Sequence, residues 1–199
     1  NADTVEDARV ALFYEVDGIG LCRTEHMFTD SKRINLVRQM ILTNSDKERG
    51  SIIERLLPIQ KEDFIDLFKE MSNLPVTIRL LDPPLHEFLP NSQQEIQRTA
   101  NLMAITEQQL ADRIKDLSEF NPMLGTRGVR LGVMVPEIYD MQVQAIFLAA
   151  IEVFKKYKIV VNPEIMIPLI SANKEVDLVR DRIKNCLLYT SDAADEEDS

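Results

Sequence analysis

The sequence is short of the residues from which disulfides and metal sites are commonly built. It holds two cysteines and two histidines in 199 residues. One cysteine, Cys186, falls in a C-terminal run that is treated separately below, which leaves Cys22 as the only cysteine of the main part. A single cysteine excludes an internal disulfide and fits a reducing compartment.

Glycine is scarce too, and the acidic residues are scattered. The segment Gly18–Gly20 resembles the start of a dinucleotide-binding loop, but it lacks the third glycine and the helix start of that fingerprint. Four glutamates have no spacing that would assemble a magnesium site, and we predict no metal site in this chain. They are Glu25, Glu87, Glu137 and Glu164.

Basic residues are outnumbered, and no long apolar run occurs. The formal net charge is −10, which argues against nucleic acid and against an anionic membrane as partners. No stretch approaches the roughly 20 apolar residues that span a bilayer. We therefore predict neither a nucleic-acid-binding nor a membrane protein.

The last fourteen residues, 186–199, do not read as native protein. They begin Cys-Leu-Leu-Tyr-Thr-Ser, which resembles the translation of a transposase adapter used in preparing DNA sequencing libraries. The alternative is a genuine acidic tail. Without this run the chain has 23 basic and 28 acidic residues, a net charge of −5. Because the first residue is Asn1 rather than methionine, we expect residues 1–185 to be an internal piece of a longer enzyme, forming part of one domain.

Two short motifs about fifty residues apart each place an arginine at or near the end of an apolar strand. The first runs from Gly18 to Phe28 and contains Arg23, and the second runs from Val76 to Phe88 and contains Arg79. A charged guanidinium at such a position is costly unless it binds an anion. Two such arginines predict a doubly charged anion, such as a phosphate monoester that also carries a carboxylate.

Strand and helix patterns alternate along the chain. The strands are expected at 18–22, 75–81, 129–135 and 165–170. Helices are expected at 31–42, 45–57, 61–71, 136–157 and 174–184. Capping boxes predict three more helix starts, at Asp3 with Glu6, at Ser92 with Glu95 and at Thr106 with Gln109. The two helices after Ser92 and Thr106 are largely polar and should lie outside the main core. Four repeats of strand and helix imply an α/β fold with a parallel sheet.

The arginine motifs resemble the phosphoenolpyruvate-binding barrel of the pyruvate, phosphate dikinases, within the PEP-utilising enzyme family. The forms Cys-Arg-Thr-Glu-His-Met-Phe at 22–28 and Leu-Asp-Pro-Pro-Leu-His-Glu-Phe at 81–88 carry the resemblance. Two further segments fit, at 121–128 and 163–169. The resemblance covers about residues 1–185 and implies part of a (β/α)8 TIM barrel, strands two to five with their helices. In such barrels, ligands bind at the carboxyl ends of the strands.

The resemblance also implies roles for four residues. Arg23 and Arg79 would bind the phosphoryl group of phosphoenolpyruvate, and Asp82 and Arg127 would support them. From the residues alone, Arg23 could instead be a surface arginine paired with Glu25. Arg79 could form a purely structural ion pair with Asp82, and Arg127 could lie at the surface.

Other parts of the family's machinery are expected outside this chain. The resemblance places the phosphorylated histidine on a separate swivelling domain, so His26 and His86 are interpreted as structural groups or as support for the site. It places the catalytic cysteine on a later loop, so Cys22 is not that residue. Mg²⁺ is the expected cofactor of the parent enzyme, with ligands on later strands.

The function implied is that of a pyruvate, phosphate dikinase piece. The parent would interconvert ATP, phosphate and pyruvate with AMP, diphosphate and phosphoenolpyruvate, and would be a homodimer in the cytoplasm, or in the plastid of a plant. The expected partners are phosphoenolpyruvate or pyruvate and the phosphohistidine domain of the same parent chain. The isolated piece should be inactive. The alternatives are a piece of phosphoenolpyruvate synthase or a related phosphotransferase, and an α/β piece without catalytic function.

Overall fold

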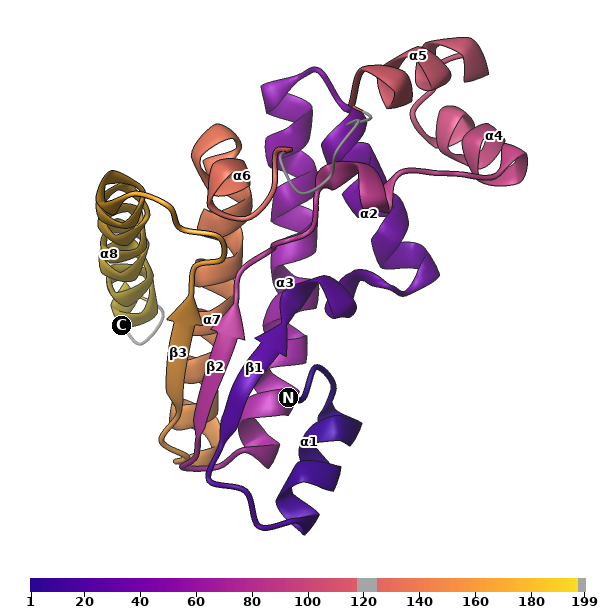
Figure 1. Cartoon of the computed structure of the whole chain (residues 1–199). Coiled ribbons are helices and arrows are strands. Elements are labelled where there is room, and N and C mark those ends of the chain that lie inside the picture. The colour runs from indigo at the N-terminus through magenta and orange to yellow at the C-terminus, as the bar shows by residue number, and fades with distance from the viewer. Residues whose placement is uncertain (118–124, 197–199) are drawn as a thin grey trace.

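The structure, a computed structural model, describes residues 1–117 and 125–196 (Figure 1). Its elements follow one another in a strand and helix alternation, so the predicted α/β class is confirmed. In chain order they are α1 (Val5–Phe13), β1 (Ile19–Arg23), η1 (Thr24–Phe28), α2 (Ser31–Leu42), α3 (Asp46–Glu70), β2 (Pro75–Arg79), η2 (Leu85–Phe88), α4 (Gln93–Leu102), α5 (Glu107–Leu117), α6 (Val129–Met134), α7 (Pro136–Tyr157), β3 (Asn162–Met166) and α8 (Asn173–Glu196).

The three strands form one parallel sheet in the order β1-β2-β3. In the register, Cys22 pairs with Ile78 and Arg23 with Arg79, and Arg79 in turn pairs with Met166. Side chains alternate between the two faces of a strand, so paired residues of neighbouring strands share a face. Cys22 and Ile78 are fully buried on one face, and the arginines lie on the other.

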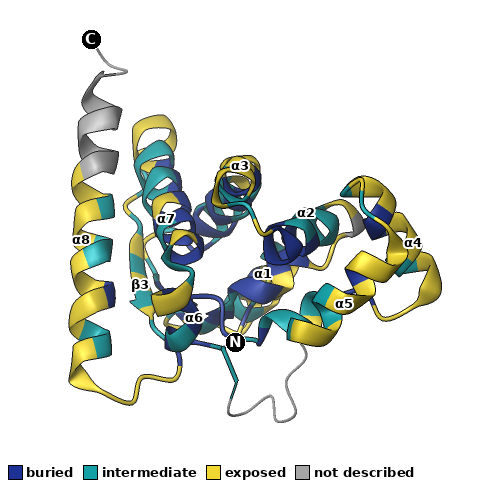
Figure 2. Cartoon of the chain, turned by 90° about the horizontal axis from the view of Figure 1, so that it is seen from above, coloured by how far each residue is buried: buried dark blue, intermediate teal, exposed yellow. Residues whose placement is uncertain are grey.

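Helices α3 and α7 cover the buried face of the sheet. In Figure 1 they lie behind the strands, and in Figure 2 their buried residues face the interior of the molecule. Phe64 and Phe68 of α3 stack at 6.0 Å between ring centroids, and Ile146 and Val153 of α7 are fully buried. The other face of the sheet is open, and Asn162, Glu164 and Met166 of β3 are exposed there.

Most helix starts follow the capping pattern of the sequence. The Thr106–Gln109 box is formed in both directions, with the Thr106 N–H donating to Gln109 Oε1 at 3.0 Å and the Gln109 N–H to Thr106 Oγ at 3.2 Å. Ser45 and Ser92 also cap α3 and α4 as predicted. The first box is displaced by one residue, because Thr4 rather than Asp3 caps α1.

Helices α4 and α5 project from the body of the molecule, as their polar sequences predicted. They lie far from the sheet in Figure 1 and are largely exposed in Figure 2. Thr99 and Ala100 are the buried residues of α4, and Leu110 is that of α5. In the described segments, no helix is long and apolar enough to cross a membrane.

The predicted strand at 129–135 is wrong, because these residues form helix α6. Apolar residues at 129, 131 and 133 alternate as in a strand, but Val133 is exposed while Gly132 is buried. Gly128 begins the helix in the left-handed region, at φ 55°, and Gly132 bonds back to its carbonyl at 3.2 Å. The part of the chain that the structure describes therefore holds three strands, not four.

Several other boundaries differ from prediction. β2 ends at Arg79 rather than at Leu81, and β3 begins at Asn162 rather than at Ile165. β3 ends at Met166 rather than reaching Ile170, and Leu169 lies at φ 56°, which a strand cannot accommodate. The two helices expected at 45–57 and 61–71 are one helix, α3, that continues through Pro58. Helix α8 runs on to Glu196 and so crosses the start of the suspected adapter run, and Leu187 and Leu188 are 40% and 64% exposed.

Gly132 is packed where no side chain fits, which gives a test of the α6–α7 junction. A Cβ at this position would lie 2.4 Å from ring atoms of the buried Tyr139. We expect Gly132→Ala to lower the free energy of unfolding by about 1–3 kcal/mol, measured in urea. Gly50→Ala in α3 is the matched control, because nothing lies within 4 Å of that Cβ. It should instead stabilise the chain by about 0.5–1 kcal/mol, and equal effects would contradict the packing argument.

The C-terminal run should add little to stability. Leu187 and Leu188 are exposed and Cys186 is only partly buried against the core, so removing residues 186–199 costs little of the apolar surface that the structure describes as buried. We expect the thermal midpoint of the truncated chain to stay within about 3 °C of the intact one. Removing residues 173–199, which takes the buried Val179 with it, should lower the midpoint clearly. A large loss from the short truncation would favour a genuine tail.

Candidate functional site

Arg23 and Arg79 end neighbouring strands and face the open side of the sheet. They are the last residues of β1 and β2 and are partners in the parallel register. Both side chains are partly buried, at 30% and 20% exposure. Arg127, in the turn before α6, pairs with the same aspartate as Arg79, and its side chain is 17% exposed. The structure thus brings these three arginines to the carboxyl end of the sheet.

Asp82 joins two of the arginines. Its Oδ2 lies 3.0 Å from Arg79 Nη1 and 3.0 Å from Arg127 Nη2. The Asp82 side chain is 7% exposed, so both ion pairs are shielded from water. A buried carboxylate between two guanidinium groups compensates charges that would otherwise be costly. The arrangement fixes Arg79 and Arg127 relative to each other.

Glu25 is a second partner of Arg79, which the sequence alone does not predict. Its place in the sequence suggests Arg23, two residues earlier, as its partner, whereas Glu25 Oε1 pairs with Arg79 Nη2. The 3-10 turn η1 follows β1 directly and carries Glu25 across to the neighbouring strand. Among the described residues, the buried atoms of this cluster without a hydrogen-bond partner include Glu25 Oε2, Arg79 Nε and Asp82 Oδ1.

Arg23 is held by a separate carboxylate. Its backbone N–H donates to Asp3 Oδ1 at 2.6 Å, and its guanidinium contacts Asp3 Oδ2 at 3.2 Å. His26 Nδ1 lies 2.8 Å from the same oxygen. Arg23 and Arg79 therefore share a face of the sheet but have different ion-pair partners.

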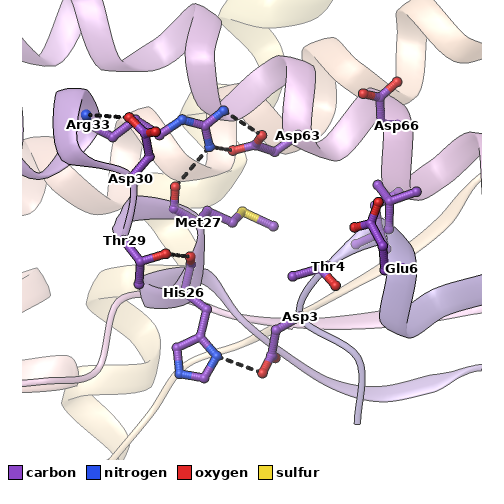
Figure 3. Close-up of a pocket in the computed structure, with 12 residues that line it drawn as sticks. Asp3, Thr4, Glu6, His26, Met27, Thr29, Asp30, Arg33, Asp63 and Asp66 are labelled. Carbon is purple, nitrogen blue, oxygen red and sulfur yellow. Dashed lines mark hydrogen bonds and ion pairs between the residues drawn. The ribbon is translucent and has the colours of Figure 1, made fainter.

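The cavity beside Asp3 is unsuited to an anion. It measures about 220 Å³ and lies between η1, α1 and α3 (Figure 3). Its one arginine, Arg33, binds Asp63, and burial raises the pKa of that carboxyl in spite of the pairing. The other acidic residues of its lining are Asp3, Glu6, Asp30 and Asp66. These carboxylates would repel a phosphate, so the open face of the sheet is the better candidate.

His26 shares Asp3 with Arg23 rather than joining the ion pairs of Asp82 with Arg79 and Arg127. The His26 side chain is 50% exposed and bonds to Asp3, and His86 is partly buried in η2. Cys22 is fully buried against the core, and burial raises the pKa of its thiol to about 12. Among residues 1–117 and 125–196, no three histidine, cysteine, aspartate or glutamate side chains are grouped to hold a metal ion.

The chain belongs to the PEP-utilising enzyme family. The family model described as "PEP-utilising enzyme, PEP-binding domain" matches residues 1–196. Within this family the chain is similar to pyruvate, phosphate dikinase. It is 50% identical over 184 residues to that of Rhizobium meliloti, a match that covers 92% of this chain and 20% of the relative.

Two further relatives carry the same description. The chain is 49% identical over 179 residues to pyruvate, phosphate dikinase of Giardia intestinalis, covering 90% of this chain and 20% of the relative. It is 46% identical over 181 residues to that of Clostridium symbiosum, covering 91% and 21%. The resemblance found in the sequence is thus confirmed, and the chain spans about a fifth of the length of these relatives.

The buried thiol gives a test of the inner face of β1. With a pKa of about 12, Cys22 is almost wholly protonated near neutral pH, and only the thiolate is alkylated. We expect iodoacetamide at about pH 8 to modify Cys22 in the folded chain on the order of a thousandfold more slowly than a free thiol. Peptide mapping separates Cys22 from Cys186, and unfolding in urea should restore the ordinary rate. Rapid labelling of Cys22 in the folded chain would contradict its placement.

Proposed function

We propose that residues 1–185 form part of the phosphoenolpyruvate-binding barrel of a pyruvate, phosphate dikinase. The observation that carries the proposal is the register pair Arg23–Arg79 at the carboxyl ends of two parallel strands. Ligands of such barrels bind at that end of the strands. The open face that carries the arginines would then be the inside of a barrel that the rest of the parent protein completes.

Arg23 and Arg79 have the chemistry to bind the phosphoryl group of phosphoenolpyruvate. A guanidinium is always charged and offers two parallel N–H donors, which match two oxygens of a phosphate. During transfer, negative charge spreads over the oxygens of the phosphoryl group, and positioned cations stabilise it. Arg127 and Asp82 would support Arg79, since both lie in the same buried ion-pair cluster.

The carboxylates around the arginines set how strongly the site attracts an anion. Glu25 and Asp82 balance Arg79 and Arg127, and Asp3 balances Arg23. The formal charges of these three arginines and three carboxylates therefore cancel. We propose that phosphoenolpyruvate binds to guanidinium N–H groups left over from these pairs, among which Arg79 Nε has no hydrogen-bond partner in the described part.

The remaining chemistry would belong to other parts of the parent protein. The described residues offer no grouped metal ligands, so they do not fit a Mg²⁺ site by themselves. Mg²⁺, the phosphohistidine domain and the proton-transfer cysteine would be supplied by segments outside this chain. Residues 186–199 would contribute nothing, as a run of adapter origin.

The assignment predicts that charge alone does not suffice at positions 23 and 79. We suggest replacing the homologous segment of the Rhizobium meliloti enzyme with residues 1–185 and measuring phosphoenolpyruvate formation from pyruvate, ATP and phosphate. Arg79→Lys and Arg23→Lys should each lower kcat/KM by about a hundredfold or more, because lysine keeps the charge but loses the two parallel donors. Isothermal titration of phosphoenolpyruvate into residues 1–199 would test binding separately.

Arg98→Lys is the matched control, because Arg98 is exposed on α4, away from the sheet. It should leave kcat/KM unchanged. Near-normal turnover of both Arg23→Lys and Arg79→Lys would overturn the phosphate-binding assignment. Turnover by residues 1–199 alone would show that the missing segments are not needed for the chemistry.

A further inference from the structure

The peptide groups of Leu81 are held by two side chains of one helix. The Leu81 N–H donates to Gln142 Oε1 at 2.8 Å, and the Tyr139 hydroxyl donates to the Leu81 carbonyl at 3.0 Å. Gln142 and Tyr139 lie three residues apart on α7, so they occupy the same face of that helix. They are 0% and 3% exposed, so water does not compete for either hydrogen bond.

The residues on either side of Leu81 are held as well. The Leu80 N–H donates to the Met166 carbonyl of β3 at 3.0 Å, and the Gly128 N–H donates to the Asp82 carbonyl at 2.9 Å. β2 ends at Arg79, so its regular pairing does not fix this segment. The backbone of residues 80–82 is instead anchored to β3, α7 and the start of α6. This anchoring determines where the Asp82 carboxylate lies between Arg79 and Arg127.

We infer that Tyr139 and Gln142 are positioning residues that hold Asp82 and, through it, the Arg79–Arg127 pair in the geometry that binds phosphoenolpyruvate. The ligand in this statement rests on the proposed function, whereas the anchoring of residues 80–82 does not. The hydrogen bonds described above join both side chains to the backbone of Leu81 and not to the open face of the sheet. Both act through the Leu81 backbone.

The chemical character of the two side chains suits this role. Burial, with a smaller contribution from the charge of Asp82, raises the pKa of the Tyr139 hydroxyl, so it remains a donor at any physiological pH. Gln142 offers an acceptor without adding a third buried carboxylate near Asp82 and Glu25. Its Nε2 has no hydrogen-bond partner within the described residues, which is costly in a fully buried amide. A leucine would avoid that cost but would leave the Leu81 N–H unpaired.

The test compares Tyr139→Phe and Gln142→Met with the controls Tyr157→Phe and Gln144→Met, which change exposed residues of the same helix. The affinity for phosphoenolpyruvate is measured by titration of the 199-residue chain. Exchange of the Leu81 amide and the Nε–H signals of Arg79 and Arg127 are followed by NMR. We expect each test variant to weaken binding about three- to tenfold and to shift both arginine signals, and the controls to do neither.

A double-mutant cycle separates positioning from a general loss of stability. In an Asp82→Asn background, Tyr139→Phe should change the affinity by less than about twofold while still lowering the stability. Unchanged affinity and arginine signals in both single variants would overturn the inference, as would an undiminished effect in the Asp82→Asn background. If the unmodified chain does not bind phosphoenolpyruvate, turnover of the chimeric enzyme decides the proposed function instead. The inference is then decided by the Nε–H signals of Arg79 and Arg127 in the test variants. A shift of these signals supports it, and unchanged signals overturn it.

Discussion

The Asp82 carboxylate, shared between Arg79 and Arg127, is the interaction on which the candidate site depends. One oxygen lies 3.0 Å from a nitrogen of each guanidinium, and the side chain is almost fully buried. Without it, only Glu25 would be left to balance Arg79, and the link between Arg79 and Arg127 would be lost. Breaking such a buried arrangement typically costs about 3–5 kcal/mol. Asp82 must therefore stay in place, which is what the hydrogen bonds to the backbone of residues 80–82 achieve.

The parallel register supplies the second condition. Arg23 and Arg79 meet because β1 and β2 run in the same direction and end together, with Cys22 and Ile78 buried on the opposite face. Helices α3 and α7 bury that opposite face, so the face that carries the arginines stays open. One helix, α7, serves both purposes, since Ile146 and Val153 pack in the core while Tyr139 and Gln142 hold the Leu81 backbone.

Local signals in the sequence were enough to find the strands that carry the arginines and most helix starts. The Thr106–Gln109 capping box, for example, forms as its residue types predict. Helix α6 was not predicted, because Val129, Leu131 and Val133 alternate with the period of a strand. The segment is too short for the period of a helix to be recognised. What excludes the strand is tertiary: the left-handed Gly128 and the ring of Tyr139 packed against Gly132.

Glu25 shows why ion-pair partners are harder to predict than strands. Sequence proximity suggested Arg23, but the turn after β1 rotates Glu25 toward Arg79, while Arg23 binds Asp3, twenty residues away in the sequence. Each arginine thus carries a carboxylate partner, and the cluster has no net charge to attract an anion from a distance. Under the proposed function, selectivity for a phosphoryl group would then come from the geometry of the guanidinium donors rather than from long-range attraction. This is why the residues that fix that geometry matter as much as the arginines themselves.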